Sequence, residues 1–158
     1  MKNPNPLTLY VPIKQDAETQ AKAFLAYQAF VPAVTDGLNK SGILHFANLS
    51  LVPNAKKDNP DGKTPYLALL LTTTFDGAMN PYLKFFWDNP STQAAFAGLA
   101  ALALNPPVPA VKDLIGFENF INSNNLSKPS DLYRGYTQTV AQIHAKFPPA
   151  ETQHTDHK

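Results

Sequence analysis

Runs of apolar and aromatic residues with the pattern of β-strands occur at four places along the chain. Residues 7–13 carry apolar side chains at every second position, which is the period of a half-buried strand. Residues 43–52 and 66–74 are predicted to form two central strands, and the polar stretch 53–65 between them an exposed hairpin loop. Residues 132–137 are rich in aromatic, strand-forming side chains and are predicted to form the last strand.

Helical spacing of apolar residues predicts helices between and after these strands. A first helix is expected from Asp16, whose side chain suits an N-cap, to about Asn39, and Pro32 is expected to kink or divide it. After the third strand, Asn80 is expected to cap a helix that runs to Trp87. Further helices are predicted up to Leu104 after an interruption at 88–91, over 111–121 and over 139–147.

The predicted elements follow one another in the order of a known α+β arrangement. Strand, helix, two strands, helices, strand and helix make the βαββαβ pattern of a ferredoxin-like fold, here with additional helices beside an antiparallel sheet. The 158 residues suffice for one core, and we predict one domain over residues 1–147 and a disordered polar tail over 148–158. A second copy commonly covers the other face of such a sheet, so we expect a homodimer.

The composition narrows the classes of partner and of chemistry. A formal net charge of +1 with 16% charged residues disfavours nucleic acid, because phosphate contacts need clustered lysine or arginine. The chain has no cysteine, which excludes disulfides, thiolate nucleophiles and cysteine-based metal sites. The start of the chain shows no apolar targeting segment, and the most apolar later stretch, 94–104, is shorter than the ~20 residues of a membrane span. A cytoplasmic protein of bacterial type without a membrane span is therefore the default prediction.

Two polar residues stand at marked places in the central strands. His45 lies at the start of the first one, where strand parity groups it with Ala47 and Leu49. It is either a hydrogen-bonded histidine at the sheet edge or a residue that contacts a ligand, and no second histidine lies at metal-ligand spacing from it. Asp76 ends the second strand and is either a general base or a cap of the following turn, in which Gly77 would take a positive φ.

A lone arginine lies in the aromatic stretch near the end of the chain. Arg134 is the only arginine in the sequence and lies between Tyr133 and Tyr136. Its guanidinium is suited to hold a carboxylate or phosphate of a ligand while it stacks on a tyrosine. It is equally suited to pair with a structural carboxylate such as Asp76 or Asp131. Arg134 and Tyr136 therefore join His45 and Asp76 as candidate ligand-binding residues.

Three short motifs carry a resemblance to a known group of proteins. The strand His45-Phe46-Ala47-Asn48, then Phe75-Asp76-Gly77 before a helix, and later Tyr133-Arg134-Gly135 resemble uncharacterised bacterial proteins with a ferredoxin-like domain of the dimeric α/β-barrel type. In those proteins the first motif is His-Phe-Ala-Arg. The resemblance extends from Gly42 to about Lys146. Asn48 stands where arginine is usual, so an anion-binding role at that position is not carried over.

The resemblance also implies an alternative with a cofactor. The wider superfamily of dimeric α/β barrels includes haem peroxidases, chlorite dismutases and small monooxygenases, an analogy of fold rather than of site. In a haem protein of this kind, His144 on the last predicted helix would be the axial ligand, because an imidazole there can face an apolar slot. The other interpretation of His144 is a partly exposed helix histidine.

Two functions remain open from the sequence. The first is a dimeric binding or accessory protein without a cofactor. The second is an enzyme with a pocket between sheet and helices, either haem-dependent or cofactor-free on a small organic substrate, that uses His45, Asp76 and Arg134. The first is favoured because the sequence shows no complete catalytic triad, phosphate-binding glycine loop or metal cluster. A pocket with His45 or His144 directed into it would favour the enzyme.

Overall fold

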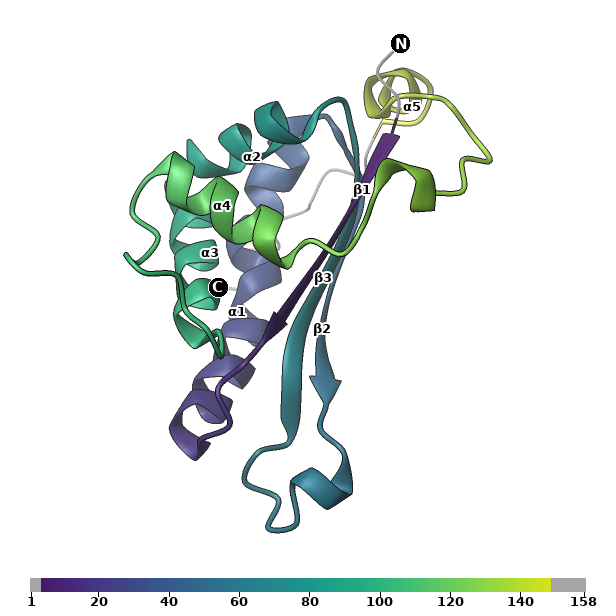
Figure 1. Ribbon diagram of the computed structural model, residues 1–158. Coiled ribbons are helices and arrows are strands. Elements are labelled where there is room, and N and C mark those ends of the chain that lie inside the picture. Colours follow the sequence, from purple (N-terminus) through teal and green to yellow (C-terminus); the bar gives the residue numbers. More distant parts are fainter. Residues whose placement is uncertain (1–3, 149–158) are drawn as a thin grey trace, which may run out of the picture.

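The structure, a computed structural model, describes residues 4–148 and has one antiparallel sheet with helices packed against it (Figure 1). The three strands are β1 (Pro4–Pro12), β2 (Leu44–Pro53) and β3 (Tyr66–Asp76). Their order in the sheet is β1-β3-β2, so the strand that is last in sequence lies in the middle. Prolines at both ends of β1 are tolerated because β1 is an edge strand, where a missing N–H breaks no ladder on its outer side.

Helices α1 to α4 lie on one side of the sheet, and α5 lies on the other (Figure 1). The α-helices are α1 (Ala17–Ser41), α2 (Met79–Trp87), α3 (Pro90–Leu102), α4 (Leu114–Asn124) and α5 (Val140–Lys146). Two short 3₁₀ turns are η1 (Lys56–Asp58) and η2 (Pro129–Asp131). None of the helices in residues 4–148 is long and apolar enough to cross a membrane.

Alternate residues of the strands form the floor of the core. Leu9 pairs with Leu71, which pairs in turn with Leu49, and all three are buried on the side of α1 to α4. Aromatic rings fill the space between sheet and helices, where Phe75 stacks on Tyr82 with ring centroids 3.9 Å apart. The Tyr82 hydroxyl is hydrogen-bonded to the Thr73 hydroxyl at 3.0 Å, and burial raises the pKa of Tyr82. The predicted apolar alternation of β1 is thus confirmed.

Helix α1 starts where the sequence predicts. The Asp16 carboxylate accepts a hydrogen bond from the Thr19 backbone N–H, and this bond lowers the pKa of Asp16. Of the two outcomes expected at Pro32, a kink or a division, the helix is not divided, because α1 is continuous to Ser41. Phe30 and Val34, buried on either side of Pro32, hold the helix against the core there. Proline removes one helix hydrogen bond, and packing of this kind outweighs that loss.

Helices α1 and α3 meet where glycine leaves room for them. Gly37 of α1 lies against Thr92 of α3, so that a Cβ on Gly37 would stand 3.0 Å from the Thr92 Oγ1 atom. Asn89 caps α3, and its side chain would lie 3.2 Å from the same Cβ. The sequence prediction of an interruption before α3 is confirmed, whereas Asn80 lies inside α2, whose N-cap is Ala78.

The ferredoxin-like prediction is wrong. The sheet has three strands, and residues 132–137, expected as a fourth, are irregular. The outer edge of β1 is already occupied at Thr8, whose carbonyl accepts from the Leu126 N–H and whose N–H donates to the Asn125 side chain. The later residues therefore leave the sheet edge without joining its ladder. The tail expected to be disordered lies, from residue 149, outside the described residues.

The sheet face opposite α1 to α4, hereafter the open face, is mainly polar. Its central row places Thr8, Thr72 and Asn48 beside one another, and the next row places Tyr10, Leu70 and Ser50 together. An antiparallel sheet tolerates one solvated face of this kind. One end of the open face is crossed by the last part of the described chain, and that end holds the candidate site.

Candidate functional site

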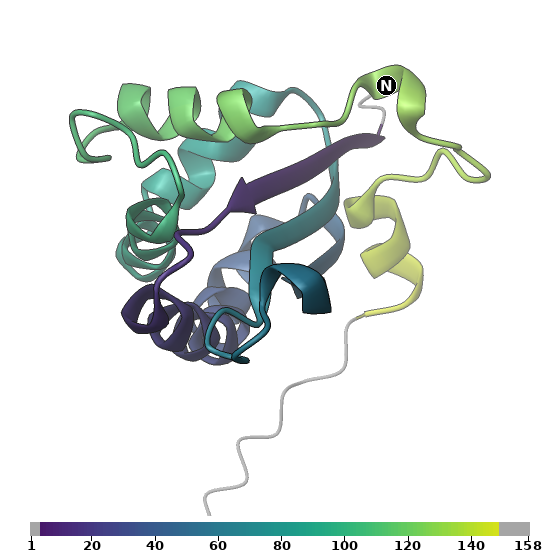
Figure 2. The ribbon, with the colours of Figure 1, turned by 60° about the horizontal axis from the view of Figure 1, so that its bottom comes forward.

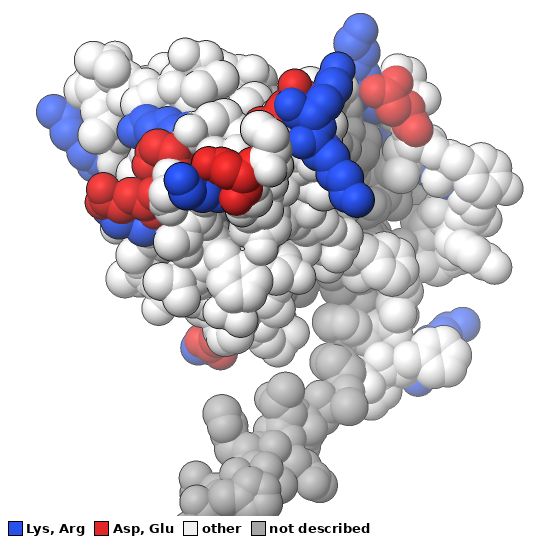
Figure 3. All heavy atoms as spheres, turned by 90° about the horizontal axis from the view of Figure 1, so that it is seen from below, with Lys and Arg blue, Asp and Glu red and all other residues white. Residues whose placement is uncertain are grey.

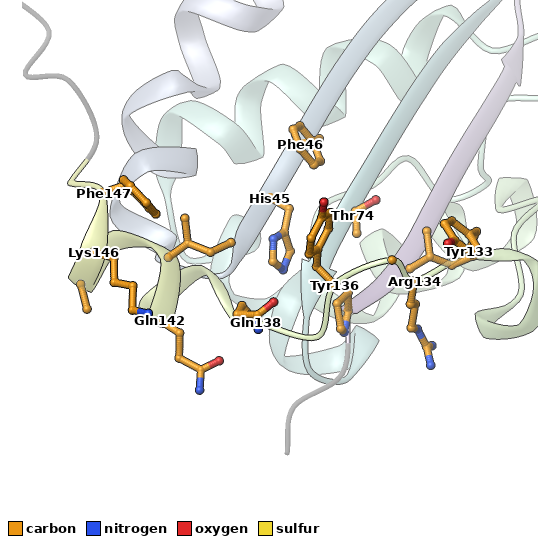
Figure 4. A pocket seen from close by; sticks show the side chains of 15 residues that line it. His45, Phe46, Thr74, Tyr133, Arg134, Tyr136, Gln138, Gln142, Lys146 and Phe147 are labelled. Carbon is orange, nitrogen blue, oxygen red and sulfur yellow. The ribbon is translucent and has the colours of Figure 1, made fainter.

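The candidate site is a groove between the open face and residues 126–147, hereafter the C-terminal segment. This segment begins at the outer edge of β1 and crosses the end of the sheet to α5 (Figure 2). The groove has a volume of about 1050 Å³. The sheet contributes Pro4, His45, Phe46 and Thr74 to it, and the C-terminal segment contributes residues 132–136, 138, 142, 143 and 145–147 (Figure 4).

A β-bulge directs His45 toward the groove. Leu44 pairs with Phe75 and Phe46 pairs with Thr74, so His45 is an extra residue without a partner of its own in this register. A bulge places two consecutive side chains on the same side of a strand, here His45 and Phe46 on the open face. The parity that grouped His45 with the buried Leu49 is therefore wrong. The bulge is a local irregularity that alternation of residue types does not reveal.

His45 and Asp76 form a hydrogen-bonded pair at the floor of the groove. The His45 Nε2 atom lies 2.9 Å from Asp76 Oδ1, and the two side chains are 10% and 3% exposed. The second carboxylate oxygen, Oδ2, accepts a hydrogen bond of 2.7 Å from the Val140 backbone N–H at the start of α5. The buried carboxylate is thus satisfied by two donors, which is the condition for keeping a charge away from water.

The hydrogen bond to Asp76 also determines what His45 offers to a ligand. When the imidazole is neutral, Nε2 carries the proton that Asp76 accepts, and Nδ1 carries the lone pair. Within residues 4–148 the Nδ1 atom has no hydrogen-bond partner. His45 therefore presents an oriented acceptor nitrogen at a groove large enough for a small organic molecule.

The two interpretations of Asp76 can now be compared with its contacts. Gly77 has a positive φ of 92°, as predicted. The Asp76 side chain does not cap the turn that follows; it bonds to His45 on β2 and to Val140, which is 64 positions away in sequence. Asp76 is not among the residues that line the groove, and it stands behind His45. Its role in the site is therefore to position His45 and α5.

The other two predicted residues, Arg134 and Tyr136, both line the groove. Arg134 pairs with neither of the carboxylates proposed for it, because Asp76 bonds to His45 and Asp131 accepts from the Lys128 N–H. Its guanidinium donates only a long bond of 3.4 Å to the Pro129 carbonyl, so among the described residues it has no carboxylate partner. The structure thus brings all four predicted residues to one end of the sheet.

Exposed aromatic side chains form the walls of the groove, and most of them were not predicted. The exposed fractions are 77% for Phe46, 91% for Tyr133, 84% for Tyr136 and 72% for Phe147. Figure 4 shows Phe46, Tyr136 and the amide side chain of Gln138 around His45, with Phe147 and Tyr133 toward opposite ends of the groove. Phe46 carried a signal in the sequence, since it follows His45 directly. Phe147 carried no signal in the sequence, because its place in the groove depends on the path by which the C-terminal segment crosses the sheet and positions α5.

His144 does not line the groove. It is half-buried on α5, while its neighbours Ile143 and Ala145 contribute to the lining. An axial haem ligand has to face the slot that holds the cofactor. His144 therefore does not fit the role of axial ligand that the haem alternative gave it. In residues 4–148 no group of three or more His, Cys, Asp or Glu side chains lies close enough to hold a metal ion.

Charges of both signs are interspersed on the described surface. Seen from the end that carries the β2–β3 loop, blue and red side chains lie next to one another (Figure 3). Among the described residues, ion pairs between residues four apart on a helix join Lys22 to Glu18 and Lys40 to Asp36. On this face the described residues form no broad basic surface of the kind that nucleic-acid binding requires.

Comparisons with protein-family models, with curated proteins and with solved structures give no match. The resemblance of the short motifs around His45, Asp76 and Arg134 therefore remains a prediction.

Proposed function

We propose that the protein is a binding protein for a small molecule with an aromatic or apolar body, held in the groove between the open face and the C-terminal segment. The observation that supports this proposal is the combination of a groove of about 1050 Å³ with exposed aromatic side chains along its walls. Ligand pockets of small organic molecules are typically about 300–1000 Å³ and lined mainly by apolar and aromatic side chains.

The cost of exposing these aromatic side chains explains why a ligand is favoured. Phe46, Tyr136 and Phe147 are each more than 70% exposed although they lie around one hollow. A fully buried aromatic residue removes about 150–250 Å² from water, and contiguous exposed apolar surface commonly marks a binding site. A flat molecule placed among these rings would cover them, while His45, Gln138 and Gln142 would supply the few polar contacts that orient it.

The proposal is tested with a fluorescent aromatic probe, 1-anilinonaphthalene-8-sulfonate, titrated into the folded protein. We expect saturable binding at one site per chain and a loss of affinity of about fivefold in Tyr136→Ala, since one stacking contact contributes about 1 kcal/mol. Phe46→Ala is expected to act in the same direction. Circular dichroism of each variant establishes that the fold is intact.

The matched control is Leu25→Ala, because Leu25 is 63% exposed on α1 and does not line the groove. It removes exposed apolar surface at a distance from the groove, so the probe affinity should not change. Binding that does not saturate, or an equal loss of affinity in Leu25→Ala, would contradict a site in the groove.

The homodimer expected from the sequence is proposed as the state of this binding protein. Beyond the groove, the row of Tyr10, Leu70 and Ser50 on the open face has no described helix over it. A second copy placed there would bury the apolar parts of Tyr10 and Leu70 without obstructing His45. Isologous contacts of this kind are the commonest interface of homo-oligomers.

A further inference from the structure

We propose that His45 is a catalytic base that removes a proton from the carbon next to the carbonyl group of an aromatic ketone, so that the protein catalyses keto–enol tautomerisation. This inference depends on the proposed binding of an aromatic molecule in the groove. It starts from an observation that binding alone does not explain: the floor of the groove is a nearly buried histidine held by a carboxylate.

The arrangement of Asp76 is that of a positioning residue. Its two oxygens are held by different donors, Nε2 of His45 at 2.9 Å and the Val140 N–H at 2.7 Å. The carboxylate therefore cannot rotate away when the imidazole changes its protonation state. A carboxylate in this position fixes the tautomer with the lone pair on Nδ1 and stabilises the imidazolium that forms once Nδ1 has accepted a proton.

The absence of a neighbouring nucleophile indicates which proton His45 takes. Covalent acyl transfer needs a hydroxyl or thiol hydrogen-bonded to the base. The chain has no cysteine, and among residues 4–148 no serine, threonine or tyrosine hydroxyl is bonded to the Nδ1 atom of His45. Proton abstraction from the ligand itself needs only the oriented base and a donor for the carbonyl oxygen, both of which the groove can provide.

The proposed step balances without a further reactant. The C–H bond breaks, its proton goes to Nδ1 of His45, and its electron pair forms a carbon–carbon double bond while the carbonyl π electrons move to oxygen. The oxygen then receives a proton from the imidazolium, which gives the enol and restores neutral His45. The Tyr136 hydroxyl and the Gln138 amide lie around His45 and are the donors available to the developing negative oxygen (Figure 4).

The ring of the substrate has two functions in this proposal. It packs among Phe46, Tyr136 and Phe147, and this packing places the carbon beside the ring near the base. A carbon between an aromatic ring and a carbonyl group is also a stronger acid than an ordinary carbon next to a carbonyl. The substrate class is therefore a ketone with a benzylic carbon next to the carbonyl.

The test is deuterium exchange at the benzylic carbon of phenylacetone in D₂O, followed by proton NMR with the full-length protein. Binding of phenylacetone is measured in the same samples by saturation-transfer difference NMR. We expect the protein to accelerate exchange above the buffer rate and His45→Gln to lose at least about 100-fold of that acceleration, since general base catalysis contributes about 10²–10⁴. His144→Gln is the matched control, because this histidine does not line the groove and its loss should leave the rate unchanged.

The outcomes separate this inference from the proposed function. Phenylacetone that binds to the wild-type protein without exchange above buffer overturns catalysis and leaves the binding function standing. A rate that falls equally in His45→Gln and His144→Gln also overturns it, whether or not either variant is fully stable. If the wild-type protein shows neither binding of phenylacetone nor exchange above the buffer rate, the result contradicts both proposals.

Discussion

Replacement of Asp76 by alanine tests the connection between the groove and α5. The carboxylate is 3% exposed, and its two oxygens bond separately to His45 and to the Val140 N–H. α5 has seven residues, and Val140 is the one among them that is buried. A helix this short is not stable by itself in water, so its hydrogen bonds persist only while it is docked.

The size of the effect follows from the bond that is lost. A hydrogen bond to a charged group contributes about 1.5–3 kcal/mol, and the Val140 N–H would be left buried without its acceptor. At about 1.4 kcal/mol for each tenfold change, undocking of α5 should become roughly 10- to 100-fold more frequent in Asp76→Ala. The sheet keeps its own pairing, because the backbone N–H of residue 76 still donates to the Ile43 carbonyl.

Hydrogen–deuterium exchange followed by mass spectrometry measures this directly. We expect faster exchange in peptides that cover α5 and little change in peptides that cover β1 and β3. Asp131→Ala is the control, because Asp131 belongs to the same C-terminal segment but is exposed and caps the turn η2. Exchange of α5 that is the same in Asp76→Ala as in the wild type would refute the view that Asp76 holds this helix.

Two further predictions concern the core and the open face. Gly37→Ala should lower the free energy of unfolding in a denaturant titration by about 1–2 kcal/mol, because the added Cβ would crowd Thr92. The control is Gly98→Ala, whose added Cβ would have no atom within 4 Å. It should raise the free energy of unfolding by up to about 1 kcal/mol, because alanine favours the helix over glycine. A higher stability in Gly37→Ala would show that α1 and α3 separate freely. Sedimentation equilibrium should show a dimer that Leu70→Asp converts to a monomer, and a wild-type monomer at all concentrations would remove the homodimer proposal.

Local signals in the sequence were sufficient for much of the fold. The carboxylate of Asp16 and the helical spacing after it predicted the start of α1, because an N-cap is satisfied within three residues. Residues 132–137 show the limit of such signals, since they have strand composition but do not join the outer edge of β1. That edge is occupied at Thr8 by Asn125 and Leu126, a contact between residues more than 100 positions apart.

The candidate site was predictable in its members but not in its arrangement. His45, Arg134 and Tyr136 were identified by residue type, and all three line the groove. The side to which His45 points depends on a bulge that alternation cannot reveal, and its bond to Asp76 depends on the register of β2 against β3. The contribution of α5 depends on the path of the chain across the sheet, which no local pattern in the sequence specifies.

The strand order has a consequence for how the chain folds during translation. β1 and β2 are both synthesised before β3, yet in the finished sheet each of them pairs only with β3. No part of this sheet can therefore form until synthesis reaches β3 at Tyr66, a delay of roughly 3–11 s after Pro12 at about 5–20 residues per second. During that interval β1 and then β2 lack their strand partner. β1 stays unpaired for the longest time, so a chaperone that binds extended nascent segments would bind β1 most readily.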